Sequence, residues 1–163
     1  MNVIQHMSDA ASAGTPTSRL AKLAGHPDKR VREAAAGNPG LSEDVMRRLG
    51  QDPDLEVRYR LTFNRSITPS VLALLGNDES SRVRVRVADN PNTPPEVMRG
   101  MLEPASLGVY LALARNPSTP NDILQQILDN TERCPDGMDS VDCGAVLTAI
   151  RARRGLAGQV VGG

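Results

Sequence analysis

The sequence is poor in aromatic residues and cysteine, and each scarcity excludes a class of protein. The 163 residues include no Trp, one Phe (Phe63) and two Tyr, so the core must be aliphatic and Phe63 is expected to lie in it. Two cysteines, Cys134 and Cys143, are too few for a disulfide scaffold and too few to hold a metal cluster alone. Long apolar runs and a secretory signal are also missing. We therefore expect a cytoplasmic protein that does not enter a membrane.

Charge of one sign is also missing, because 19 basic residues balance 19 acidic ones. A neutral chain has no net field to attract DNA or RNA, which argues against a protein that binds nucleic acid through its overall charge. The basic residues are almost all Arg, a bias that a GC-rich genome of bacterial type would explain.

What the sequence does contain is an internal repeat of 26 residues. One column of the repeat is Asn38, Asn64, Asn90 and Asn116. A second column is Val31, Val57, Val83 and Val109. Apolar residues keep the same step from about residue 15 to residue 128. We therefore predict tandem structural units, each of which covers the apolar face of the next.

Each unit is predicted to contain two short helices. Thr93 and Thr119 precede Pro, as an N-cap precedes the first helical turn, and apolar residues then recur at helical spacing. After a turn, a second segment places an apolar residue four positions after the repeated Val. The Asn of the repeat, usually followed by Pro, then ends the unit.

One segment has a pattern that is typical of a strand. Residues 82–87 alternate Arg and Val without interruption. The 26-residue register aligns this segment with units that do not alternate, so we predict a helix. Some of these second segments are short and β-branched enough to form 3₁₀ rather than α-helix.

The repeat sets the expected domain organisation. Residues 1–13 and the Gly-rich residues 155–163 are expected to be flexible, and residues 14–154 to form one helical-repeat domain. Its units are predicted at 15–40, 41–66, 67–92, 93–118 and 119–154, with an insertion near 131–143. The expected fold is an all-α solenoid of about five helix pairs with a 26-residue period and no sheet.

These units resemble the leucine-rich repeat variant family. The resemblance covers about residues 15–128 and is clearest in Leu23-Ala24-Gly25-His26-Pro27-Asp28, Val31-Arg32-Glu33-Ala34-Ala35-Ala36 and Asn38-Pro39. It implies a right-handed superhelix of α and 3₁₀ helices without a sheet, and repeats that act mostly as scaffolds. A described member carries an iron–sulfur cluster in a separate cysteine-rich segment. This chain lacks that cysteine set, so the resemblance implies no cofactor here.

Arginine columns are the first candidate binding residues. Arg32, Arg58 and Arg84 share a column, and the stretch 57–87 contains Arg58, Arg60, Arg65, Arg82, Arg84 and Arg86. On one interpretation these side chains form a basic stripe for a phosphate backbone or an acidic peptide. On the other, the Arg after each buried Val is structural and pairs with Asp28, Asp54 or a loop carbonyl.

Other polar positions are interpreted mainly as structural. The Asn column (Asn38, Asn64, Asn90, Asn116) is expected to satisfy backbone groups in successive turns. His26 takes the place of Asp52 and Asp78 in its column and is interpreted as a capping residue. Tyr110 replaces an Arg in its column and is a candidate exposed contact.

The insertion is a weaker candidate site. Counting 26 residues from Val109 reaches Pro135, and the buried pattern resumes only at Val146 and Ile150. The inserted residues lie between Cys134 and Cys143 and include three acids. Either this is a redox-sensitive or metal-assisted loop, or it is an acidic surface loop with two thiols.

These observations favour a monomeric, non-enzymatic scaffold without a cofactor, which binds another protein or peptide through its curved face. Only two His are present, and no Gly-rich phosphate loop or paired catalytic acids stand outside the repeat pattern. The alternative is nucleic-acid or phosphate binding through the central Arg stripe. A redox or metal-responsive module at Cys134 and Cys143 is a third, less favoured interpretation.

Overall fold

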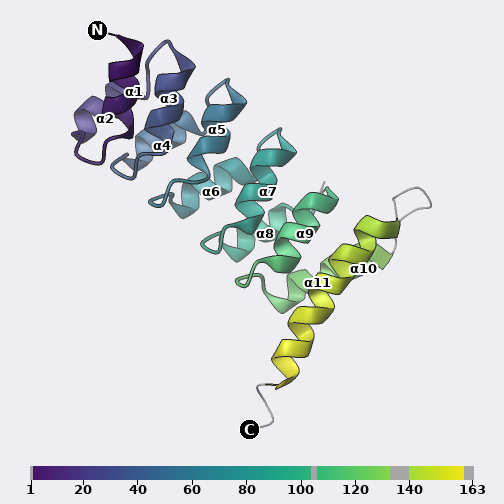
Figure 1. Cartoon of the computed structure of the whole chain (residues 1–163). Coiled ribbons are helices and arrows are strands. Elements are labelled where there is room, and N and C mark those ends of the chain that lie inside the picture. Colours follow the sequence, from purple (N-terminus) through teal and green to yellow (C-terminus); the bar gives the residue numbers. More distant parts are fainter. Residues whose placement is uncertain (1, 104–105, 133–139, 160–163) are drawn as a thin grey trace. The chain divides into compact units, whose positions relative to one another are not determined.

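The structure, a computed structural model, describes residues 2–103, 106–132 and 140–159. These residues form eleven α-helices and no strand or 3₁₀ helix (Figure 1). The helices are α1 (Val3–Ala11), α2 (Thr17–Leu23), α3 (Lys29–Ala36), α4 (Glu43–Leu49), α5 (Leu55–Leu61), α6 (Pro69–Gly76), α7 (Ser81–Asp89), α8 (Pro95–Gly100), α9 (Leu107–Arg115), α10 (Asn121–Glu132) and α11 (Ser140–Gln159). The prediction of an all-α helical repeat is confirmed. None of these helices is both long and apolar enough to span a bilayer.

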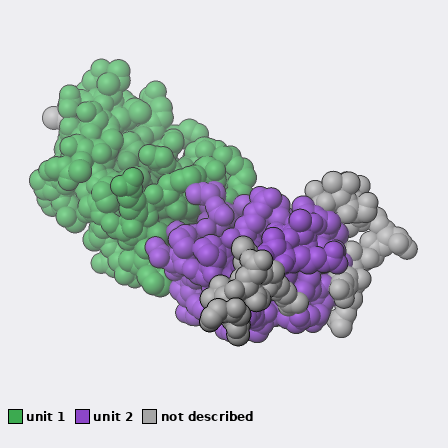
Figure 2. All heavy atoms as spheres, turned by 60° about the horizontal axis from the view of Figure 1, so that its bottom comes forward, with its two compact units in different colours: residues 1–83 green, residues 84–163 purple. Residues whose placement is uncertain are grey.

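The chain forms two compact units, residues 1–83 and residues 84–163, coloured separately in Figure 2. The division falls inside α7. In the first unit, α3 packs against α1 on one side and α5 on the other, so these second-segment helices form a row (Figure 1). The first-segment helix α4 contacts α3, α5 and α6. The core lies between these helices.

The repeated valines form the inner face of the second helices, as the register requires. In α3, Val31 and Ala35 are fully buried, and in α5, Val57 and Leu61 are fully buried. These residues are four apart, so they lie one above the other on the same side of a helix. The first helices contribute Leu20, Met46, Leu72 and Leu75, each at most 1% exposed.

The alternating Arg–Val segment is helical, as the 26-residue register predicted. Residues 81–89 form α7, with Val83 and Val87 fully buried and Val85 half-buried. Burial of the two valines at helical spacing outweighs the strand preference of the local pattern.

The side chains of Thr93 and Thr119 bond the preceding helix and do not cap the helix that follows. The N-cap of α8 is Pro94, and Thr93 Oγ1 instead donates a hydrogen bond to the carbonyl of Val87 in the preceding helix, at 2.6 Å. Thr119 does the same to Leu113, at 2.7 Å. The last carbonyls of a helix have no partner within it, so these hydroxyls satisfy the end of one helix rather than the start of the next.

The amino-terminal segment differs from the sequence-based expectation of a flexible residues 1–13. Residues 3–11 form α1, capped by Asn2, whose Oδ1 accepts a hydrogen bond from the Ile4 amide. The helix buries Ala10 fully, and Asn38 Nδ2 donates to the carbonyls of Ala10 and Ser12, each at 2.8 Å. Because α3 has an apolar side left uncovered by its own repeat, α1 packs there in the place of a preceding second helix.

In the second unit, α9 and α11 lie side by side and α10 contacts both. Val146 and Ile150 of α11 are fully buried, together with Val109 and Leu113 of α9. The backbone of α11 runs from residue 140 to residue 159, so the helix is longer than the predicted 143–154 and includes part of the expected tail. Residues 160–163 and most of the predicted insertion, including Cys134, lie outside the described residues.

Candidate binding surface

The Arg58 side chain is structural and lies inside the first unit. Its guanidinium donates to both carboxylate oxygens of Asp78, at 2.8 and 3.2 Å, and to the carbonyls of Asp52 and Pro53. The Arg58 and Asp78 side chains are only 8% and 4% exposed. The hydrogen bonds that Arg58 donates to Asp78 raise the pKa of Arg58 above its usual value, although burial acts in the opposite direction. Arg58 therefore cannot serve as an exposed phosphate-binding residue.

Arg32 makes the equivalent contacts one repeat earlier. It donates to Asp52 Oδ2 at 2.6 Å and Oδ1 at 2.9 Å, and to the carbonyls of His26 and Pro27. Arg32 and Arg58 thus make structural contacts, as one of the two interpretations of this column expected. Their acidic partners are Asp52 and Asp78, however, rather than Asp28 and Asp54. Asp28 and Asp54 instead cap α3 and α5 by accepting from the second amide of each helix.

The pairing follows a rule across the described residues: the residue at the position of Arg32 in the 26-residue register contacts the side chain 20 positions later. Four pairs obey it, namely His6–His26, Arg32–Asp52, Arg58–Asp78 and Tyr110–Asn130. For Arg84 the corresponding position is residue 104, outside the described residues. We call these the 20-residue pairs. In the first three pairs the partner lies in the turn that precedes α3, α5 or α7, whereas Asn130 lies within α10.

Tyr110 therefore has the structural role of the Arg that it replaces. Its hydroxyl accepts a hydrogen bond from Asn130 Nδ2 at 3.0 Å and donates to the carbonyl of Leu102 at 3.2 Å. The side chain is half-buried. These contacts do not favour the interpretation of Tyr110 as an exposed binding residue.

The asparagine column forms hydrogen bonds inside each unit. In the first unit, Asn64 Nδ2 donates to the carbonyls of Ala36 and Asn38, each at 2.8 Å, and its Oδ1 accepts from the Ser66 amide. Asn38 makes the same set of contacts with Ala10, Ser12 and Gly40. In the second unit, Asn116 bonds Ala88, Asn90 and Ser118 in this way, and Asn90 Oδ1 accepts from the Asn92 amide.

The remaining arginines of the predicted stripe differ in their surroundings. Arg82 pairs with Glu56 at 2.8 Å, and in the second unit Arg86 pairs with Asp89 at 2.9 Å. Arg84 is half-buried, whereas Arg60 and Arg65 are exposed. The predicted stripe is thus divided among buried ion pairs, exposed ion pairs and exposed cations, which weakens the case for a continuous phosphate-binding surface.

Phe63 is exposed, contrary to the prediction that it lies in the core. Its exposed fraction is 43%, and its ring meets the ring of Tyr59 edge to face with centroids 5.2 Å apart. The Arg82 guanidinium lies over the Tyr59 ring, with its central carbon 4.4 Å from the ring centroid. Phe63 follows the end of α5 in a turn, whereas Val57 and Leu61 within the helix are fully buried.

Arg60 lies across the end of α3 because residue 37 is Gly. A Cβ at this position would come within 2.9 Å of Arg60 Nε and 3.1 Å of Nη2. The missing side chain at Gly37 therefore makes room for the guanidinium. We call Tyr59, Arg60, Phe63 and Arg82 the α5 patch: Tyr59 contacts Phe63 and Arg82, and Arg60 follows Tyr59 on α5.

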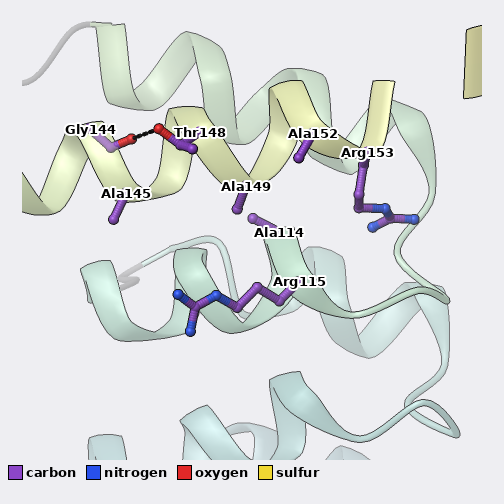
Figure 3. Close-up of a pocket in the computed structure, with 8 residues that line it drawn as sticks. All are labelled: Ala114, Arg115, Gly144, Ala145, Thr148, Ala149, Ala152 and Arg153. Carbon is purple, nitrogen blue, oxygen red and sulfur yellow. Dashed lines mark hydrogen bonds between the residues drawn. The ribbon is translucent and has the colours of Figure 1, made fainter. Parts of the chain in front are cut away.

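A pocket of about 560 Å³ lies in the second unit between α9 and α11 (Figure 3). Its walls are small side chains of α11 together with Ala114, and Arg115 and Arg153 stand at its edges. Arg153 donates to the carbonyls of Asn116, Pro117 and Thr119 and so holds α11 to the turn after α9. Cys143 is half-buried on α11, and the described residues contain no group of three side chains that could hold a metal ion.

Residues 30–54 match the family model described as leucine rich repeat variant. They include α3, α4, Arg32 and its partner Asp52. The resemblance recognised in the sequence is confirmed there. No curated protein and no solved structure matches the chain significantly.

The 20-residue pairs were missed in the sequence although a signal was present. His26 had been placed in the column of Asp52 and Asp78, and Tyr110 in the column of Arg58. Reading the two columns together would have shown that they change together, since His faces His and Tyr faces Asn. The α5 patch had no such signal, because the exposure of Phe63 depends on how the turn after α5 leaves the helix.

Proposed function

We propose that the chain is a scaffold that binds a protein or peptide through the α5 patch. The observation that carries this proposal is the exposed Phe63, which lies edge to face against Tyr59, the ring that Arg82 covers. Aromatic residues and Arg dominate the energetic centres of protein interfaces because they combine large contact area with directed hydrogen bonds. Arg60 is exposed and follows Tyr59 directly on α5, and its guanidinium can receive a carboxylate.

The chemistry of the patch indicates the kind of segment that it would bind. An apolar side chain would pack on Phe63 and Tyr59, and a neighbouring Asp or Glu would pair with Arg60. Arg82 already pairs with Glu56 and stacks on Tyr59, so it would hold the ring rather than bind the partner.

Site-specific photocrosslinking tests this proposal. A photoreactive amino acid at position 63 is expected to form an adduct with a protein from the native cell, and the same amino acid at exposed position 47 on α4 is the control. With the purified partner, Phe63→Ala is expected to weaken binding about 10- to 100-fold. Equal adducts from both positions would contradict the proposal. An adduct with nucleic acid, with binding that weakens steeply with salt, would favour the alternative function.

Gly37→Ala provides a second, more selective variant. The added Cβ is expected to displace the flexible Arg60 guanidinium while the free energy of unfolding changes by less than about 1 kcal/mol. Its effect on the affinity for the partner should therefore equal that of Arg60→Ala. Isothermal titration calorimetry of the two variants and of their combination checks this, because combining them should weaken binding no further.

A further inference from the structure

The first of the 20-residue pairs is built from two imidazoles. His6 of α1 stands where Arg32 and Arg58 stand in later repeats, and His26 stands where their acidic partners stand. His6 Nδ1 and His26 Nε2 are 3.1 Å apart, and the rings meet nearly edge to face with centroids 4.9 Å apart. An Arg–Asp pair keeps its charges from pH 5 to pH 8, whereas imidazole changes its charge in this range.

The hydrogen bonds determine where the protons lie in this pair. The Asp28 amide donates to His26 Nδ1 at 3.0 Å, so this nitrogen carries no proton. His26 must then carry its proton on Nε2 and donate it to His6 Nδ1. Both imidazoles are therefore neutral in this arrangement. A proton added to either acceptor nitrogen would face an N–H group, and one of the two hydrogen bonds would be lost.

The charges around the pair are already matched. Asp9 of α1 pairs with Arg19 of α2. Hydrogen bonds donated by Gln5, the larger cause, and by Arg19 lower the pKa of Asp9. Beside His26, the side-chain hydrogen bond from Arg30 lowers the pKa of Asp28 to about 2, so both carboxylates stay ionised across the His range. Arg32 of α3 donates a hydrogen bond to the carbonyl of His26 and forms an ion pair with Asp52. The three acids Asp9, Asp28 and Asp52 are thus each paired with an arginine.

The helix that carries His6 has few other attachments. Of the residues of α1, only Ala10 is fully buried, whereas Ile4 is 72% exposed. The remaining contacts include the hydrogen bonds of Asn38 to the end of the helix, the bond from Thr15 Oγ1 to the Asp9 carbonyl, and the Asp9–Arg19 pair. Elements with little buried apolar surface open locally at a lower free energy than the rest of a fold.

We propose that His6 and His26 form an acid-released latch that controls whether α1 covers α3. At pH values above the range in which imidazole changes its charge, both rings are neutral and the His6–His26 hydrogen bond forms. As the pH falls through this range, protonation breaks the His6–His26 contact and α1 leaves the side of α3 against which it packs. The sign follows from linkage: the released state binds more protons than the closed state, so the closed state gains stability as pH rises.

Hydrogen exchange of the full chain tests the latch. The protection factors of the α1 amides, which correct for the intrinsic effect of pH on exchange, are measured at about pH 7.5 and about pH 5.5. A closed arrangement that excludes one proton from the pair makes the opening constant about tenfold larger at the lower pH, and one that excludes two protons makes it up to about a hundredfold larger. Protection in α1 is expected to fall accordingly. Protection in α3 and α5, joined by the Arg32–Asp52 pair, is expected to change far less.

The matched variant is His6→Arg combined with His26→Asp, which installs the pair used by the next two repeats. We expect this variant to lose the pH dependence of α1 protection. Equal protection of α1 at the two pH values in the unmodified chain would overturn the proposal by itself. The proposal would also fail if the folded double variant kept the original pH dependence, since the release would then depend on other groups.

Discussion

Arg58→Ala is expected to lower the free energy of unfolding of the first unit by about 3–5 kcal/mol, as is typical when one partner of a buried ion pair is removed. The Asp78 carboxylate, with its side chain 4% exposed, would lose two guanidinium hydrogen bonds. The carbonyl groups of Asp52 and Pro53 would each lose a donor as well. Urea denaturation followed by far-ultraviolet circular dichroism measures the change, which suits a chain without Trp.

Two further variants separate the buried charge from other effects of the substitution. Arg65→Ala removes an exposed arginine of the same unit and should change the free energy of unfolding by no more than about 0.5 kcal/mol. Adding Asp78→Asn to Arg58→Ala removes the unpaired charge and should restore at least about 1 kcal/mol. A loss below about 1 kcal/mol for Arg58→Ala would show that the 20-residue pair does not hold adjacent repeats together.

The second large effect is expected from Asn64→Ala, with a loss of about 2–4 kcal/mol in the free energy of unfolding. Asn64 is 2% exposed, and its side chain bonds the carbonyls of Ala36 and Asn38 and the Ser66 amide. Its removal leaves three backbone groups of two repeats without this partner. The loss should exceed the value of one ordinary hydrogen bond, because buried polar groups left unmatched carry a desolvation cost.

The same denaturation experiment checks this prediction against two matched variants. Asn77→Ala, at an exposed position of the same unit with one bond of 3.3 Å, should cost less than about 0.5 kcal/mol. Asn64→Asp keeps the shape and the acceptor for Ser66 but turns an oxygen toward two carbonyls. It should therefore be at least as destabilising as Asn64→Ala. Stability equal to that of the unmodified chain would disprove the role of the asparagine as a link between repeats.

Together these predictions describe how a repeat with short helices becomes stable. Helices of seven to nine residues, such as α3 and α5, are marginal in isolation. Each is fixed by a buried Val, by an Asn that bonds the preceding repeat, and by a 20-residue pair that bonds the next. The His6–His26 pair replaces the charged version of this link at the amino-terminal end, which is why the proposed pH response is confined to α1.

The sequence by itself determined the repeat, the helical class and the buried columns. A 26-residue step in Val and Asn can be read without a structure, because every unit must bury the same positions against its neighbours. Even the alternating segment 82–87 was assigned correctly, since register across repeats is a stronger constraint than local pattern.

Only the tertiary structure decided which polar groups meet. The partners of Arg32 and Arg58 lie 20 residues away, and the choice of Asp52 over Asp54 depends on the path of the turn that precedes α5. The exposure of Phe63, the use of Thr93 by the preceding helix and the packing of α1 on α3 also depend on backbone geometry at helix ends. Periodicity specifies which side of a helix is buried. It does not specify the direction in which the chain leaves that helix, and this direction places the polar contacts.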